Sequence, residues 1–388
     1  MARCASAILE TQIRLLSDDS KPMSRPTAAI IDRQALRHNF ALAQSLAPTA
    51  RCMPMVKANA YGHGAVEVSK ALSAQAPAFG VACIEEALAL RDAGIEKPIL
   101  LLEGTFSNDE VNIAAQNNFW LMVENDNQQR AIIDANTASP ITVWLGMDTG
   151  MHRLGFAPAE IGDRYRELEH SSNVASTIVI ATHFACADEV NNDATNRQLA
   201  LFEKTTSTIT AAEGKRIEHS LANSAAVLAW PQSHANWQRP GYMIYGNSPF
   251  AIPQINADKL QPAMSFQSAV ISLRHIDVAE SVGYTANWSA TRPSTIATLC
   301  VGYGDGYPRH APNGTPVLIR GHQCPLVGRV SMDMITVDVT DLAEVAIGDN
   351  AVLWGSGLSV NDVAKHCDTI GYELITQLSD RVPRQYVN

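Results

Sequence analysis

Lys57 is the residue whose position in this chain best suits covalent chemistry. It follows a short apolar segment, residues 51–56, that has the length of a buried strand, and Tyr61 and two glycines come shortly after it. Apolar residues then recur at helical spacing from residue 65 to residue 72. Lys57 is therefore expected at a strand-to-helix junction, where a rigid strand end can present an amine that carries a cofactor.

Other residues suited to chemistry also follow predicted strands and do not precede them. They are Arg153 after the fifth strand, His183 at the end of the sixth, Asn223 and Ser224 after the seventh, and Arg239 and Gly241 around the start of the eighth. Small side chains and free backbone N–H groups after the last two strands are typical of a phosphate site. A lysine facing such a site suggests pyridoxal 5′-phosphate, bound as a Schiff base.

Apolar strand-like segments alternate with helix-like segments over the first two thirds of the chain. The predicted strands are residues 51–56, 79–83, 98–102, 120–123, 141–145, 177–181, 217–221 and 241–245. The predicted helices cover residues 84–93, 109–117 and 128–135, and others begin near residues 158, 191 and 225. Nearly continuous apolar strands indicate a parallel sheet buried on both faces, and eight of them favour an α/β fold closed into a (β/α)8 TIM-type barrel. An open doubly wound sheet is the alternative.

The sequence pattern changes beyond residue 260, where short strand-like segments alternate with turns. These segments are residues 264–276, 294–301, 316–320, 334–339 and 350–354. We therefore expect residues 23–260 to form the barrel and residues 261–388 to form a C-terminal mainly-β domain. Residues 1–22 are expected to be a disordered N-terminal extension, because a second methionine, Met23, precedes the first strand-like segment.

The composition argues against several classes of function. The 388 residues carry a formal net charge of -10 and no basic run, so we expect no nucleic-acid partner. No apolar stretch is long enough to span a membrane. The seven cysteines include no Cys-x-x-Cys pair, which indicates reduced thiols, a cytoplasmic location and no cysteine metal site. A small molecule is the expected partner.

From about residue 27 to its end, the chain resembles the bacterial alanine racemases. The matching segments are residues 56–64 (VKANAYGHG), 148–155 (DTGMHRLG), 182–185 (THFA), 223–225 (NSA), 239–241 (RPG), 282–284 (VGY), 302–306 (GYGDG), 328–333 (GRVSMD) and 381–386 (RVPRQY). The resemblance implies an isomerase that uses pyridoxal 5′-phosphate to interconvert L-alanine and D-alanine, the latter a precursor of peptidoglycan. It also implies a homodimer with shared active sites.

The resemblance assigns the cofactor to a set of residues in this chain. Lys57 would hold pyridoxal 5′-phosphate, Arg239 would face its pyridine nitrogen, and the other cofactor-binding residues would be Tyr61, His183, Ser224, Gly241, Tyr242 and Tyr386. A permanently charged guanidinium does not share its site with a protonated pyridinium, so the ring would be a weaker electron sink. A less stabilised carbanion favours rapid reprotonation, which suits racemisation.

Racemisation requires a proton to leave one face of Cα and another to arrive on the opposite face, so two acid–base groups must flank the substrate. The resemblance implies that Tyr284, from the partner subunit, serves the α-proton of the L-enantiomer and Lys57 that of the D-enantiomer. Arg153 and the backbone N–H of Met332 would bind the substrate carboxylate.

One position departs from the family pattern. Most members have a lysine two positions before the aspartate of the residue 148–155 segment, and its carbamylated amine gives a negative charge that orients the arginine; here that position is Gly146. We expect Arg153 to use another anion, such as chloride, a water network or a different carboxylate, and we expect activity that does not depend on dissolved carbon dioxide.

Three alternative functions remain at this stage. The space left at Gly146 would suit a broad-specificity racemase that acts on lysine, arginine or serine. A non-catalytic pyridoxal-phosphate carrier shares the lysine-bearing barrel but lacks the β domain. A related decarboxylase would have a cysteine-bearing motif and an acidic group at the pyridine nitrogen, where this chain has Arg239.

Overall fold

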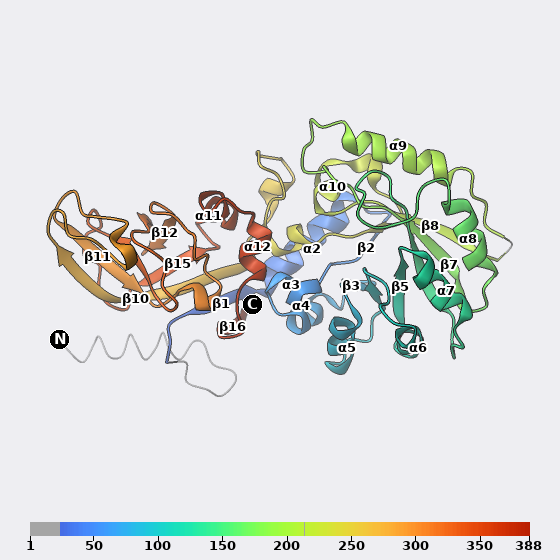
Figure 1. Cartoon of the computed structure of the whole chain (residues 1–388), viewed down its shortest axis with the longest axis horizontal. Coiled ribbons are helices and arrows are strands. Elements are labelled where there is room, and N and C mark those ends of the chain that lie inside the picture. The colour runs from blue at the N-terminus through green and yellow to red at the C-terminus, as the bar shows by residue number, and fades with distance from the viewer. Residues whose placement is uncertain (1–23, 213) are drawn as a thin grey trace. The chain divides into compact units, whose positions relative to one another are not determined.

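The computed structural model describes residues 24–212 and 214–388, so the extension expected over residues 1–22 lies outside the described residues. The contacts divide the chain into two compact units. We call Asp32–Ala263 together with Gly371–Thr376 the barrel unit. The mainly-β unit consists of Met264–Ile370, Gln377–Val387 and the described residues up to Ile31. Figure 1 labels many of the elements of both units.

Eight parallel strands form the sheet of the barrel unit. They are β2 (Arg51–Cys52), β3 (Phe79–Val81), β4 (Ile99–Leu101), β5 (Phe119–Val123), β6 (Ile141–Gly146), β7 (Val174–Ala181), β8 (Arg216–Ser220) and β9 (Trp237–Gln238). Their order in the sheet is β2-β9-β8-β7-β6-β5-β4-β3. The ends of this sheet meet where Val56 N donates to Gly80 O (2.8 Å) and Gly80 N donates to Pro54 O (3.1 Å). The predicted barrel is therefore confirmed over the open sheet.

Helices follow the strands of the barrel unit in the alternation that the sequence predicts. The helices are α2 (Arg33–Leu46), α3 (Lys57–Tyr61), α4 (Ala65–Leu72), α5 (Ile84–Asp92), α6 (Asp109–Gln116), α7 (Asp126–Asp134), α8 (Ile161–His170), α9 (Ala194–Thr206), α10 (Ser224–Ala229) and α12 (Gly371–Thr376). Short 3-10 turns are η1 (Pro231–Ser233), η2 (Tyr242–Tyr245) and η3 (Ala257–Lys259). Large side chains from alternate strand positions fill the core, among them Met55, Leu100, Met122, Trp144, Val179 and Trp237.

The prediction of a strand over residues 241–245 is wrong. The eighth strand is β9, and the apolar run after it folds into the 3-10 turn η2, which ends at Gly246 with a φ of 81°. Pro240 has no N–H to donate to a strand ladder, so the chain leaves the sheet before this run. Residues of η2 are fully buried, and a short buried turn has the same apolar composition as a buried strand.

The mainly-β unit is built on antiparallel pairs, and the predicted C-terminal mainly-β fold is confirmed. Its elements are β1 (Ala28–Asp32), β10 (Met264–Ile276), η4 (Tyr284–Ala286), β11 (Ser294–Leu299), η5 (Tyr303–Asp305), β12 (Pro316–Ile319), β13 (His322–Pro325), β14 (Ile335–Asp338), β15 (Asn350–Trp354), α11 (Val360–His366) and β16 (Arg384–Val387). The main path is β13-β12-β15-β10-β1-β16, with β11 beside β10 and β14 beside β11. In the part of the chain that the structure describes, no helix combines the length and apolar character needed to cross a bilayer.

Candidate functional site

Lys57 opens a turn whose backbone is left-handed. Ala58, Asn59, Ala60 and Tyr61 have φ angles of 51–53°, although none of them is a glycine. A left-handed conformation costs such residues about 1–2 kcal/mol each. Surrounding contacts must hold the turn, and one of them is a hydrogen bond from Ala58 N to Glu86 Oε1 (2.6 Å). Backbone strain of this kind gathers at functional sites, which marks the Lys57 turn as a candidate.

The turn is closed by a glycine that touches the backbone of α12. Gly62 has a φ of 79°, and a Cβ atom on it would lie 2.0 Å from Ile375 O. Both the conformation and the close approach therefore require glycine. Asn59 Oδ1 accepts a hydrogen bond from Ala65 N (2.8 Å) and so connects the turn to the start of α4.

The amine of Lys57 lies in surroundings that favour its neutral form. Its pKa is lowered first by burial and then by the positive charge of Arg153. No hydrogen bond or ion pair engages its side chain among residues 24–212 and 214–388. A neutral, unengaged amine is the form that reacts with carbonyl groups or accepts a proton.

Tyr61, Ser224 and Gly241 meet close to this turn. The ring of Tyr61 stacks on Tyr245, with centroids 4.8 Å apart. A Cβ atom on Gly241 would lie 2.4 Å from Tyr61 Oη, so a side chain at that position would displace the hydroxyl. Ser224 Oγ accepts hydrogen bonds from Gly241 N (2.9 Å) and Met243 N (3.3 Å). These contacts order the chain after β8 and β9.

The same region presents hydroxyl groups that remain protonated. Burial raises the pKa of Tyr61 to about 12 and raises that of Tyr242 further. The ring of Tyr242 stacks on Tyr372 of α12, with centroids 3.7 Å apart. Protonated phenols, a serine hydroxyl and backbone N–H groups are hydrogen-bond donors that suit a phosphate group. The donor set and the glycine that leaves room beside Tyr61 therefore fit the phosphate of a cofactor.

Arg239 is a buried cation beside these donors. Its guanidinium donates to Ser220 Oγ, Thr182 O (2.6 Å) and Leu221 O (3.4 Å). Burial lowers its pKa to about 10, and the negative charge of Glu124 opposes that shift. Arg239 therefore remains charged at neutral pH, and its hydrogen bonds fix the plane of the guanidinium.

His183 is held neutral at the end of β7. Its pKa is lowered to about 3, first by burial and then by the positive charges of Arg239, Arg153 and Lys57. The imidazole nevertheless has solvent-accessible surface. Gln198 Nε2 donates to the backbone carbonyl of His183 (3.0 Å), which fixes the strand end. A neutral imidazole here can donate or accept a hydrogen bond but adds no further positive charge.

Arg153 lies on a loop that is folded around Asp148. Asp148 Oδ1 accepts hydrogen bonds from Gly150 N (2.9 Å) and His152 N (3.0 Å), and Oδ2 lies 2.8 Å from His152 Nδ1. Burial opposes ionisation, but these hydrogen bonds hold the pKa of Asp148 below its usual value. The loop is thereby ordered, while the side chain of Arg153 is exposed and available to a ligand.

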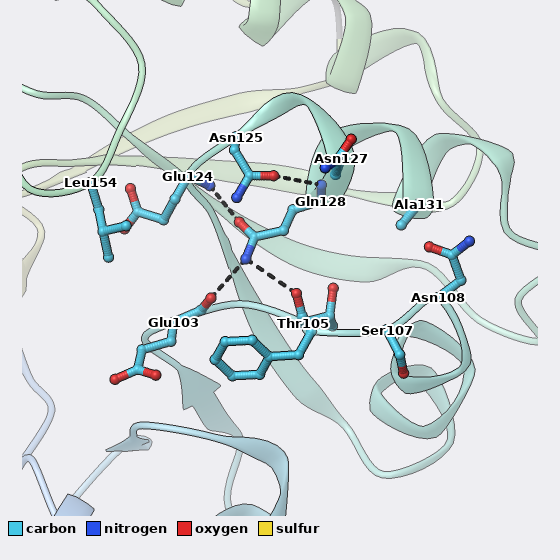
Figure 2. Close-up of a pocket in the computed structure, with 11 residues that line it drawn as sticks. Glu103, Thr105, Ser107, Asn108, Glu124, Asn125, Asn127, Gln128, Ala131 and Leu154 are labelled. Carbon is cyan, nitrogen blue, oxygen red and sulfur yellow. Dashed lines mark hydrogen bonds between the residues drawn. The ribbon is translucent and has the colours of Figure 1, made fainter.

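A pocket of about 330 Å³ lies at the carboxyl ends of β4 and β5. Figure 2 shows it lined by Glu103, Glu124, Gln128 and Leu154, among other residues. Burial raises the pKa of Glu124 to about 7. The sequence interpretation missed Glu124. The signal was present, because Glu124 follows β5 directly, as the other candidate residues follow their strands.

The remaining predicted residues lie in the mainly-β unit. Tyr284 begins η4 and is 66% exposed, and Met332 is 52% exposed. Tyr386 is part of β16. The carbonyl of Met332 accepts a hydrogen bond from Gly304 N (2.9 Å), which orders its loop. The barrel unit thus brings together Lys57, Tyr61, Arg153, His183, Ser224, Arg239, Gly241 and Tyr242, whereas Tyr284 and Met332 are presented on exposed loops of the other unit.

Comparisons with known proteins find similarity along nearly all of the chain. Residues 31–249 match the family model of the alanine racemase N-terminal domain, and residues 263–386 match that of the alanine racemase C-terminal domain. The chain is 47% identical over 363 residues to the alanine racemase of Pseudomonas taetrolens, with 94% of this chain and 99% of that protein covered. It is also 47% identical over 363 residues to the catabolic alanine racemase of Pseudomonas putida, at the same coverage of each chain.

The fold shows the same similarity. The crystal structure of the biosynthetic alanine racemase from Pseudomonas aeruginosa superposes with a TM-score of 0.89 at 47% identity, covering 94% of this chain and 100% of that chain.

Proposed function

The chain belongs to the alanine racemase family, whose members are isomerases, and from this premise we propose that it interconverts L-alanine and D-alanine with pyridoxal 5′-phosphate as its cofactor. The observation that carries the proposal is the desolvated amine of Lys57 at a strand end, in a strained turn beside a set of phosphate donors. The matched relatives carry the names of alanine racemases, so the broad-specificity, carrier and decarboxylase alternatives are not favoured.

The chain offers a residue for each part of the cofactor. Lys57 would hold it covalently, Tyr61, Ser224, Gly241, Tyr242 and Tyr386 would hold its phosphate, and His183 would be a further cofactor-binding residue. Arg239 would face the pyridine nitrogen, where its positive charge disfavours ring protonation. When bound, pyridoxal 5′-phosphate withdraws electrons from the substrate Cα and so makes the α-proton acidic.

Lys57 and Tyr284 would move the α-proton on opposite faces of the substrate. Lys57 Nζ would accept the proton of D-alanine, and its lowered pKa favours the neutral amine that acts as the base. Tyr284 Oη would accept the proton of L-alanine. Each group would return a proton when the reaction runs in the other direction, so the two roles exchange.

Arg153 and Met332 would bind the substrate carboxylate. The exposed guanidinium of Arg153 supplies charge and two parallel donors, which is the geometry that a carboxylate prefers. In the described part of the chain no acceptor engages the backbone N–H of Met332, which leaves this donor available to a ligand.

We infer a homodimer in which Tyr284 and Met332 of one copy complete the site of the other. The mainly-β unit exposes several large apolar side chains on neighbouring segments, namely Tyr284, Tyr303, Met332 and Met334. Exposed apolar residues that gather on neighbouring loops are typical of a surface that another chain covers.

The test is the loss of optical rotation of L-alanine in deuterated water, with α-hydrogen exchange followed in the same sample. Racemisation with deuterium uptake is expected for the cofactor-loaded protein, and both are expected to vanish in Lys57→Ala. If neither signal changes although the cofactor is bound, the proposed activity is contradicted.

A further inference from the structure

Glu124 and Gly146 lie side by side at the carboxyl ends of two neighbouring strands. The register of β5 and β6 pairs Val123 with Leu145, and Glu124 and Gly146 are the residues that follow this pair. A Cβ atom on Gly146 would lie 2.0 Å from Oε2 and 2.6 Å from Cδ of Glu124. The carboxylate therefore occupies the space that a side chain at position 146 would fill.

The relation between the two positions is steric, because a side chain at position 146 would require the Glu124 carboxylate to move. Gly146 is not among the residues with a left-handed φ, so its backbone conformation is open to any residue. A larger side chain at position 146 and the carboxylate in its present place exclude one another. The two positions therefore form one structural pair.

The backbone around Glu124 is fixed by Gln128. Gln128 Oε1 accepts a hydrogen bond from Glu124 N (2.8 Å), and Gln128 Nε2 donates to Glu103 O (2.7 Å) and Thr105 O (3.3 Å). Figure 2 shows this amide connecting the segments that follow β4 and β5, with the Glu124 side chain turned away from it toward Leu154. The Glu124 side chain therefore extends from a backbone segment whose position is fixed by hydrogen bonds.

The charges around Glu124 are mainly positive. Burial raises its pKa, and the attraction of Arg239 and Arg153 opposes that rise, while Asp148 adds a weaker repulsion. No direct ion pair joins Glu124 to either arginine within the described residues, so the attraction acts through space. A charge in partly desolvated surroundings is screened less than one at the surface, so this attraction reaches beyond contact distance.

We propose that the Glu124 carboxylate positions the Arg153 guanidinium for the substrate carboxylate, an inference that rests on the proposed function. Leu154, the residue after Arg153, lines the same pocket as Glu124, so the arginine loop borders the carboxylate. Attraction toward the strand end restricts the rotamers of Arg153 before the substrate arrives, which lowers the ordering cost of binding. Glu124 acts through Arg153 and does not touch the reacting atoms.

This arrangement places a carboxylate beside the position that bears a modified lysine in the family pattern. Gly146 offers no amine for carbamylation, and Glu124 brings a carboxylate into the space beside Gly146 from the neighbouring strand. A chloride ion at this place would be repelled by that carboxylate. The chain itself thus supplies the anion, without a dissolved partner.

The test compares Glu124→Gln with the wild-type protein, both loaded with pyridoxal 5′-phosphate. The substitution keeps the shape of the side chain and removes its charge. We expect the KM for L-alanine to rise about tenfold, while kcat changes by less than about threefold, because ground-state positioning of the substrate carboxylate is lost. Glu124→Asp should give an intermediate KM, since it restores the charge at a shorter reach.

The matched control is Glu103→Gln, which removes the other carboxylate that lines the pocket. Its KM should stay close to that of the wild type. An unchanged KM in a folded Glu124→Gln protein, or an equal rise of KM in Glu103→Gln, would overturn the inference. Thermal melting establishes folding, and should Glu124→Gln not fold, the inference stands or falls on Glu124→Asp, whose KM should exceed that of the wild type because its carboxylate lies further from Arg153. A wild-type protein that does not racemise alanine would refute the proposed function instead, so the two failures are distinguishable.

Discussion

The two units of the chain each contain a desolvated carboxylate that two arginines attract. The two carboxylates differ in whether hydrogen-bond donors within the chain satisfy them. In the mainly-β unit, Asp305 is fully buried and accepts hydrogen bonds from Arg25 Nη2 (2.7 Å) and Gly302 N (2.9 Å), with Arg381 Nε 3.2 Å away. In the barrel unit, the carboxylate of Glu124 has no hydrogen-bond donor among the described residues.

The difference separates a structural charge from a functional one. The carboxylate of Asp305 has hydrogen-bond and ion-pair partners within the chain. Its negative charge raises the pKa of Arg25. A charge satisfied in this way holds loops together but has little left to offer a ligand. Glu124 remains poorly solvated and unpaired, so its field acts on Arg153 and Arg239. The ionised Glu124 carboxylate therefore destabilises the barrel unit, whereas the paired Asp305 carboxylate stabilises the mainly-β unit.

The largest effect should come from removing the amine in the barrel unit. Lys57→Ala should lower the rate of alanine racemisation by more than about a thousandfold, because the base on one face and the attachment of the cofactor are lost together. Initial rates by polarimetry provide the measurement. Lys70→Ala is the control, because Lys70 is an exposed lysine that pairs with Glu67 on the surface of α4. Substantial racemisation by Lys57→Ala would contradict the assignment.

Removing the charge in the mainly-β unit should mainly affect stability. Asp305→Asn should lower the free energy of unfolding by about 3–5 kcal/mol, because two arginines would lose their buried partner. Urea denaturation measures this change. Asp341→Asn, which breaks the exposed pair with Arg292, should cost less than about 1 kcal/mol. Equal losses in the two variants would remove the distinction between a buried network and a surface pair.

Removing the charge of Glu124 should increase the free energy of unfolding, whereas removing that of Asp305 should decrease it. The folded state raises the pKa of this carboxyl to about 7 from its ordinary value of 4.5, so its contribution to stability is complete below pH 4.5 and is lost as pH rises through 7. Glu124→Gln should therefore raise the free energy of unfolding at pH 8 by up to about 3 kcal/mol, with little change at pH 4. Urea denaturation at the two pH values tests this. A destabilised variant at pH 8 would show that Glu124 is a structural charge like Asp305.

The KM for L-alanine should depend on pH through the same group. As pH falls from 8 to 6, Glu124 becomes protonated, its attraction for Arg153 is lost and KM should rise, by up to about tenfold. The pKa of His183 is about 3 and that of Asp148 is lowered, so neither titrates in this range. The dependence of KM on pH should be absent in Glu124→Gln. If the KM of Glu124→Gln still depends on pH in this range, another titratable group is responsible for that dependence.

The smallest expected effect is that of bicarbonate. Removing dissolved carbon dioxide should leave the racemisation rate unchanged, because Gly146 has no amine to carbamylate and the Glu124 carboxylate lies beside it. Rates in degassed buffer and after bicarbonate is added back give the comparison. A rate that drops on degassing and recovers with bicarbonate would mean that another amine supplies the negative charge.

Much of the fold was predictable because the parallel strands are buried on both faces and stand out as apolar runs. In the mainly-β unit, β10 and β15 span the predicted residues 264–276 and 350–354. The short strands β13 and β16 were not predicted, because sequences such as HQCP and RQYV have neither an apolar run nor clear alternation. Residues 241–245 were predicted as a strand because a completely buried turn has the same apolar composition as a buried strand.

The site was predictable where chemistry follows strand ends and unpredictable where it depends on register. The position of Lys57 could be inferred from the segment around it, but its left-handed turn could not, because no glycine marks residues 58–61. Glu124 looks like an acidic residue near the start of a helix, a common position for a solvated carboxylate. Only the pairing of β5 with β6 places it over Gly146.

The close contact between Glu124 and Gly146 also restricts how this site can evolve. A side chain introduced at position 146 alone would force the Glu124 carboxylate to move, and an uncharged residue at position 124 alone would remove the carboxylate that attracts Arg153. Each single change is therefore expected to be harmful in a background where both together are tolerated, a case of reciprocal epistasis. A lineage passing between the two designs must cross a less active intermediate or change both positions at once.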